Sequence, residues 1–178
     1  MAFKNACDAI GRSKIKVEKK FNIREFISIS QMELAWDYYR CGENVYMVYE
    51  GTQEWFCYKV ASMNKLEYLV WAREVKNCAW GRWSINMVAL QGNLAMVKYC
   101  VENGCPMDAN AWNACNVAAL KGHLDVLKYL HENDCPWDWR ACVCAYENNH
   151  NDCLNYLIEQ RCPGWERFDS THVDYDPY

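Results

Sequence analysis

Two segments of this chain repeat one another almost residue for residue at an interval of 30. Residues 92–106 read GNLAMVKYCVENGCP, and residues 122–136 read GHLDVLKYLHENDCP. A period of this length predicts a solenoid, in which short structural units stack in a row. Because one unit cannot bury its own apolar face, its neighbours must cover it, and the product is an elongated scaffold with a large surface. Scaffolds of this kind usually bind other molecules rather than catalyse reactions.

Two weaker copies flank this pair. A shift of 27 residues downstream aligns Trp112 with Trp139, and a shift of 28 aligns the copy upstream, although Cys78 precedes Cys105 by only 27. The spacing between copies changes within residues 107–113, where about three extra residues occur. Length varies most readily in a surface loop, so we expect the tip of a finger there.

Within one copy, the pattern predicts two short antiparallel helices followed by a finger. Residues 114–120 are small and apolar, which suits a helix packed closely on both neighbours, and residues 124–132 carry one apolar stripe at helical spacing. The turns between the two helices fall at Asn64, Gly92, Gly122 and Asn149, residue types that tolerate a left-handed backbone. The prolines at positions 106, 136 and 163 lack an amide donor and are expected to end the second helix.

These residues resemble an ankyrin repeat. Residues 118–123, AALKGH, match the family's Ala-Ala-x-x-Gly-His motif, and Val126, Leu127 and Leu130 match its aliphatic positions. Residues 113–116, NACN, stand in place of the usual Thr-Pro-Leu-His, and the Cys-Pro-Trp fingers are similar to those of a divergent subgroup in large DNA viruses and some protists. The resemblance implies an all-α, ankyrin-type solenoid of stacked helix-turn-helix repeats with short fingers.

The same resemblance divides the chain into three parts. We expect a cap or degenerate repeat with a basic arm over residues 1–54, about four repeats over residues 55–165, and an acidic, polar tail over residues 166–178. The arm over residues 1–24 carries a net charge of +5, from seven Lys or Arg against two acidic residues, whereas the whole chain carries −4. A solvated face that caps the first repeat is favoured over a nucleic-acid contact, because no nucleic-acid motif accompanies the charge. The tail could be disordered, lie across the last repeat, or bind another protein.

The family's mode of binding implies a scaffold or adaptor that holds an unidentified partner protein. Ankyrin proteins bind through finger tips and the exposed side of their first helices, and large aromatic residues with arginine most often anchor interfaces. In this chain the expected binding residues are Arg82, Met87, Asp108, Asn110, Trp112, Asn113, Asp138, Trp139, Arg140 and Glu147. Trp80, Met107 and Trp137 share a different repeat phase, which predicts packing between fingers. The alternative is a structural subunit of a large assembly, possibly viral, anchored through its first 54 residues and its tail.

Cysteine is abundant, with twelve residues, and could indicate disulfides or zinc. No Cys-x-x-Cys pair occurs, however, and seven cysteines recur at repeat phase, where a small buried hydrophobe is expected: Cys57, Cys78, Cys105, Cys115, Cys135, Cys142 and Cys162. A zinc site would need Cys142, Cys144, His150 and Cys153, whose spacing matches no standard four-ligand pattern. We therefore expect no metal and no cofactor, and free thiols in a reducing compartment.

Catalytic and membrane signals are absent from the sequence. There is no glycine-rich phosphate loop, no Gly-x-Ser-x-Gly elbow and no His-Glu-x-x-His motif, so an enzyme is not expected. His123 and His150 occupy the family's Gly-His position and are expected to satisfy backbone groups at a helix start. No apolar run reaches the ~18 residues of a membrane helix, and the first 20 residues have no secretory core. These features predict an intracellular protein of the cytoplasm, or of the host cytoplasm or virion if the source is viral.

Overall fold

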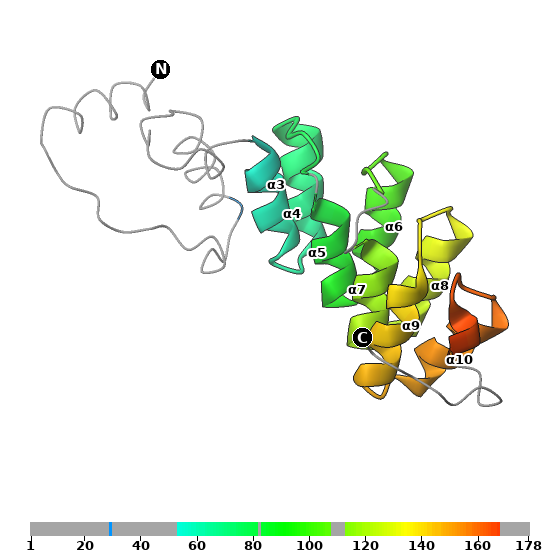
Figure 1. Ribbon diagram of the computed structural model, residues 1–178. Helices are drawn as coiled ribbons and strands as arrows, with labels where there is room; N and C mark the ends of the chain where they lie inside the picture. Colours follow the sequence, from blue (N-terminus) through cyan, green and yellow to red (C-terminus); the bar gives the residue numbers. More distant parts are fainter. Residues whose placement is uncertain (1–28, 30–52, 82, 108–112, 168–178) are drawn as a thin grey trace, which may run out of the picture.

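The computed structural model describes residues 53–81, 83–107 and 113–167, together with Ile29. In this part of the chain every regular element is helical, and the helices follow one another in pairs (Figure 1). The pairs are α3 (Gln53–Ala61) with α4 (Leu66–Val70), α5 (Ser84–Gln91) with α6 (Leu94–Glu102), α7 (Ala114–Lys121) with α8 (Leu124–Glu132), and α9 (Trp139–Glu147) with α10 (Asn151–Glu159). A π-helical segment, η2 (Trp71–Val75), continues α4, and a 3-10 turn, η3 (Trp165–Arg167), follows α10. The predicted all-α solenoid is confirmed.

The helix pairs stack in two rows. The first helices α3, α5, α7 and α9 contact one another in sequence, and the second helices α4, α6, α8 and α10 do the same (Figure 1). Six consecutive residues of α7, from Ala114 to Ala119, are buried, because α5 and α9 cover it from both sides. Small side chains allow this close approach, so the prediction for residues 114–120 is confirmed.

The apolar stripe of α8 forms the core between the two rows. Val126, Leu127 and Leu130 are fully buried, as the helical spacing predicts. Cysteines fill the same core, since all ten that the structure describes are buried and have free thiols. Their burial at repeat phase confirms that a small hydrophobe is wanted at these positions.

The turn inside each helix pair has the left-handed backbone that the sequence predicts. Its φ angle is 57° at Asn64, 69° at Gly92, 71° at Gly122 and 58° at Asn149. In the third pair, the amides of Gly122 and His123 donate to the carbonyls of Ala119 and Ala118 at 3.2 and 3.0 Å. These bonds satisfy carbonyl groups that the end of a helix would otherwise leave without donors.

The second helices end in the same way, and the prediction that proline ends them is wrong. Gly104, Asp134 and Arg161 have left-handed φ angles of 70°, 60° and 52°. The cysteine amide that follows each of them donates back five residues, as in the 2.9 Å bond from Cys105 to Cys100. The helix therefore closes with a left-handed cap before the chain reaches proline, which begins the finger.

The π-helical segment η2 accommodates one extra residue in the first described helix pair. From Asn64 to Asn77, the two left-handed positions of that pair, the chain advances 13 residues, whereas it advances 12 from Gly92 to Gly104. A π-helix absorbs an insertion by widening one turn, and so the following Cys78 stays buried in phase with the later repeats.

Candidate functional site

Exposed aromatic and charged side chains occur along the row of first helices. Trp83 directly precedes α5 and Trp139 begins α9, and they are 43% and 40% exposed. Met87 on α5 is half-buried, and Glu147 in the last turn of α9 is exposed. These helices belong to the same row (Figure 1), so their exposed sides offer an aromatic and charged surface for contact with another molecule.

The start of α9 carries the most organised part of this surface. Asp138 caps the helix, because its Oδ1 accepts from the Arg140 amide at 2.9 Å. Its Oδ2 accepts from the Arg140 guanidinium at 2.7 Å, and that guanidinium lies 5.3 Å from the Trp139 ring centre. The carboxylate thus orders the exposed arginine beside the exposed tryptophan, a combination that suits an interface anchor.

Asn113 lies in the interior, unlike the other expected binding residues that the structure describes. Its side chain is buried and caps α7, where its Oδ1 accepts from the Asn116 amide at 2.9 Å. Asn116 in turn donates to Asp138 Oδ1 at 3.4 Å, which links the start of α9 to α7. Asn113 therefore positions helix starts in the structure, and an amide cap so buried offers little area to a partner.

Four of the expected binding residues lie outside the described part of the chain. They are Arg82, Asp108, Asn110 and Trp112.

The finger tryptophans pack on the row of second helices. Trp80 Nε1 donates to the Asn103 carbonyl at 2.9 Å, and its ring meets Tyr99 edge-on at a 6.3 Å centre separation. Trp137 stacks on His131 at 3.7 Å. The expected structural role of these tryptophans is thus present, but the contacts are with second helices, where Tyr99 offers an edge-on contact and His131 a stacked one.

The two repeat histidines tie neighbouring helix pairs together. His123 Nε2 lies 3.3 Å from the Leu90 carbonyl at the end of α5, and because a carbonyl only accepts, this nitrogen donates. The histidine thus satisfies a backbone group, as expected, but in the preceding pair rather than at its own helix start. The rings of His123 and His150 lie directly over Gly92 and Gly122, so close that a β-carbon at either glycine would fall 2.5 Å from a ring atom.

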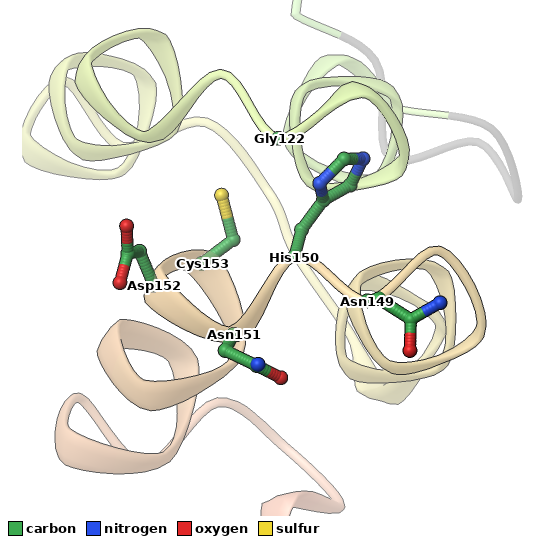
Figure 2. Close-up of a pocket in the computed structure, with 6 residues that line it drawn as sticks. All are labelled: Gly122, Asn149, His150, Asn151, Asp152 and Cys153. Carbon is green, nitrogen blue, oxygen red and sulfur yellow. The ribbon is translucent and has the colours of Figure 1, made fainter.

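A shallow hollow lies at the second of these contacts (Figure 2). Its volume is about 280 Å³, and it is lined by Gly122, Asn149, His150, Asn151, Asp152 and Cys153. In Figure 2 the His150 ring reaches toward Gly122, while the Asn149 and Asn151 amides point away from the imidazole. The lining groups diverge, so the hollow does not assemble the converging donors that a small ligand or a reaction needs.

Buried thiols lie in contact within single repeats. The thiol of Cys115 on α7 donates a hydrogen bond to Cys135 beyond α8, and this bond, with burial, raises the pKa of Cys115. Burial likewise raises the pKa of Cys57 to about 11 and that of Cys78 to about 12. Thiols held protonated in this way are poor nucleophiles, and they act here as core side chains.

The described residues contain neither a cluster of metal ligands nor a membrane-spanning helix. No group of three or more His, Cys, Asp or Glu side chains there is arranged to hold a metal ion. None of the helices in these ranges is long and apolar enough to cross a membrane.

In the part of the chain that the structure describes, two exposed aromatic residues were not among the expected binding residues. Tyr146 on α9 is 53% exposed and stands where the preceding copies have Ala89 and Ala119, both fully buried. The change from alanine to tyrosine at one repeat position is visible in the sequence and could have indicated it. Trp83 was visible as an aromatic residue at a helix entry.

Comparison with known proteins agrees with the geometry. A family model of ankyrin repeats, in three copies, matches residues 57–140 and 85–167, which together span well over half of the 178 residues. A search of curated proteins found no match. Ankyrin repeats generally mediate contacts between proteins, and proteins built from them are typically not enzymes. The matched repeats, with the stacked helix pairs that contain them, show that the chain belongs to the ankyrin-repeat family.

Proposed function

We propose that this protein is an interaction scaffold or adaptor that holds a partner protein against its first-helix face. By this face we mean the exposed parts of the first-helix row on α5 and α9, with Met87, Trp139, Arg140 and Glu147 among its residues, and the adjoining fingers. The observation that carries the proposal is the exposed Trp139 and Arg140 pair, in which Asp138 holds the arginine beside the tryptophan.

The chemistry of this face varies between repeats, while the core does not. The position of Arg140 is occupied by Trp83 and Asn113 in earlier repeats, and the position of Glu147 by Leu90. Side chains that periodicity leaves free to vary are those that can be shaped for one partner. Tryptophan and arginine contribute most when a partner buries them, and removal of such an anchor typically weakens binding by about 2 kcal/mol, or roughly thirtyfold in Kd.

The experiment is affinity purification with crosslinking from the native source, followed by binding measurements on the purified partner. Trp139→Ala with Arg140→Ala should lose at least an order of magnitude in affinity while folding normally. Alanine keeps the Trp139 β-carbon, against which Gly164 packs, so the fold should tolerate the change. Asn155→Ala, an exposed change on α10, is the matched control and should bind normally. Equal binding by all three proteins would reject the first-helix face.

The same measurements separate the alternative of a structural subunit in a large assembly. That role predicts loss of binding when residues 1–50 or 166–178 are deleted and no effect from changes on the first-helix face.

The scaffold proposal also includes contacts by four finger residues, Arg82, Asp108, Asn110 and Trp112. A reducing, intracellular location is also part of the proposal and is supported by the free thiols. Kinship with the divergent viral and protist repeats is a further part and is supported by the Cys-Pro-Trp finger.

A further inference from the structure

A buried thiol pair joins the start of α7 to the chain beyond α8. Cys115 lies in the first turn of α7 and Cys135 lies three residues after the end of α8, and these residues are 0% and 3% exposed. The Cys115 sulfur is 3.8 Å from the Cys135 carbonyl oxygen, and its thiol donates to the Cys135 sulfur. A disulfide holds two sulfur atoms ~2.05 Å apart, so a pair already in hydrogen-bond contact needs only a short approach to form one.

The Cys135 sulfur also accepts hydrogen bonds from free amides at the start of α7. The first amides of a helix have no partner within the helix. In α7 the Asn116 amide donates to Asn113 Oδ1 at 2.9 Å. The amides of Ala114 and Cys115 donate instead to the sulfur of Cys135. With the Cys115 thiol, three donors therefore converge on one sulfur atom at the positive end of a helix dipole, and this arrangement stabilises a thiolate.

The two thiols consequently differ in acidity. The hydrogen bond from the Cys115 thiol lowers the pKa of Cys135 and the two amide bonds lower it further, although burial opposes them. The Pro136 carbonyl, 3.8 Å from the Cys135 sulfur, is a weak acceptor at that distance. The bond between the thiols, with burial, raises the pKa of Cys115, which keeps its proton. Since the thiolate is the form that attacks an oxidant, Cys135 is the nucleophile of the pair and Cys115 is the second thiol.

The next repeat carries the same pair of positions, as Cys142 and Cys162, but different hydrogen bonds. Because α9 begins earlier in its repeat than α7 does, the Ala141 amide lies within α9 and donates to the Asp138 carbonyl at 2.9 Å. The Cys162 thiol donates to that carbonyl at 3.2 Å and to the Cys142 sulfur. A thiol that acts as the donor keeps its proton, so Cys162 is a poor nucleophile.

The position of Cys135 limits which oxidants can reach it. Asp134, just before it, is exposed, and Pro136 and Trp137, just after it, are half-buried. The sulfur thus lies at an edge of the fold, where a small local opening of the chain exposes it. Hydrogen peroxide is little larger than water and can enter such an opening, whereas a protein disulfide is too large. Peroxide converts a thiolate to a sulfenic acid, which condenses with a neighbouring thiol.

We propose that Cys135 and Cys115 form a peroxide-sensitive modification site, in which oxidation links the start of α7 to the chain beyond α8 by a disulfide. The Cys135 thiolate attacks one oxygen of hydrogen peroxide and the O–O bond breaks. The second oxygen takes up the proton that Cys135 had released and leaves as water, so that Cys135 becomes a sulfenic acid. The Cys115 sulfur then attacks the Cys135 sulfur, the S–O bond breaks, and the released hydroxide takes the Cys115 proton and leaves as a second water.

The two thiols thereby lose two electrons, and the peroxide gains them. A small thiol reductant reverses the reaction by thiol–disulfide exchange, so the site can return to its free-thiol form in a reducing compartment. The pair lies in the core rather than on the first-helix face, so the inference does not rest on the proposed function.

Peptide mapping of the full natural chain after peroxide treatment and alkylation of the remaining thiols tests the site. The cysteines are identified by their tryptic peptides: Cys135 in residues 129–140, Cys115 in residues 99–121 and Cys162 in residues 162–167. We expect Cys135 to be linked to Cys115 about tenfold faster than Cys162 is linked to any cysteine, and a thiol reductant should release the link. Equal rates for the two repeats would overturn the proposal. So would the absence of the link in the folded chain under conditions that oxidise the chain unfolded in urea.

Two single variants separate the roles of the two sulfur atoms. In Cys115→Ala the second thiol is missing while the two amides of α7 still hold the Cys135 thiolate. Peroxide should therefore leave Cys135 as a sulfenic acid, which dimedone traps for detection by mass spectrometry. Cys142→Ala makes the same change at the equivalent position of the next repeat and should form the natural link at the natural rate. Circular dichroism first verifies that both variants are folded. No trapped Cys135 in Cys115→Ala, or a link from Cys135 to another cysteine in the natural chain, would show the assignment to be wrong.

Discussion

Replacing Gly122 with alanine tests what the turn between α7 and α8 requires. The φ angle of Gly122 is +71°, a conformation that costs a residue with a β-carbon about 1–2 kcal/mol. The new β-carbon would also fall 2.5 Å from Nδ1 of His150. Relief of such overpacking costs a further ~1–3 kcal/mol. We therefore expect Gly122→Ala to lower the free energy of unfolding by about 2–5 kcal/mol.

Gly104 provides the matched control. Its φ angle is +70°, yet a β-carbon built on it meets no atom within 4 Å. Gly104→Ala should therefore lose only the backbone contribution, about 1–2 kcal/mol. Asn149, which occupies the position of Gly122 in the next repeat with φ of 58°, shows that the backbone cost alone is tolerated in this fold. The difference between the two glycine variants measures the contact with His150.

A double variant separates the two contributions at one site. Adding Gly122→Ala to a His150→Ala background removes the imidazole that the new methyl would strike, so its cost should fall to that of Gly104→Ala. Urea unfolding measures each free energy, and it is followed by both circular dichroism and tryptophan fluorescence because stacked repeats need not unfold together. Equal losses for the two single glycine variants, or no recovery in the His150→Ala background, would refute the reasoning.

Three other perturbations test a second-helix cap, a first-helix cap and the buried thiols. Arg161 has a φ angle of 52°, so Arg161→Gly should raise the free energy of unfolding in urea by about 1 kcal/mol; a decrease would contradict the backbone argument. Asp138→Ala should lower it by about 1 kcal/mol through loss of the α9 cap, and Asp138→Asn, which can still cap, should lose less. Burial raises the pKa of Cys57 from 9.0 to about 11, so the unfolded chain releases this proton first as the pH rises. Between pH 9 and about 11 this thiol should lower the free energy of unfolding by about 1.4 kcal/mol per pH unit. Cys57→Ala removes the thiol and should make the free energy of unfolding fall less steeply with pH, because the cost of its cavity does not depend on pH.

The fold was predictable because its signals are local to each repeat. Glycine and asparagine at the turns indicate a left-handed backbone angle, and small or aliphatic residues indicate which side of a helix packs against its neighbours. A further local signal in the sequence marks the extra residue of the first described helix pair. The upstream copy aligned at a shift of 28 through its first helix, whereas Cys78 preceded Cys105 by 27. The difference of one residue lies within the second helix, where η2 absorbs it.

The candidate site was harder to predict because repeat phase does not distinguish a contact residue from a cap. Asn113 and Arg140 occupy the same repeat position, but Asn113 is buried and caps α7, whereas Arg140 is exposed. The structural origin of this difference is a shift of two residues, because the position equivalent to the α7 cap is Arg140, whereas α9 is capped by Asp138 and begins at Trp139. Finger length decides where the helix begins, and the fingers are where these repeats differ most in length.

In a solenoid, the exposed fraction of a side chain depends on whether a neighbouring repeat lies against it as well as on the residue itself. Ala119 and Tyr146 hold the same place in successive repeats, and one is fully buried while the other is half exposed only because α9 covers the first. The sequence of a single repeat predicts which side of a helix is apolar, but it does not predict whether another helix lies against that side. The tyrosine side chain at this position is too large for the spacing at which Ala119 meets α9, so a helix packed on α9 in the same way would have to lie farther away.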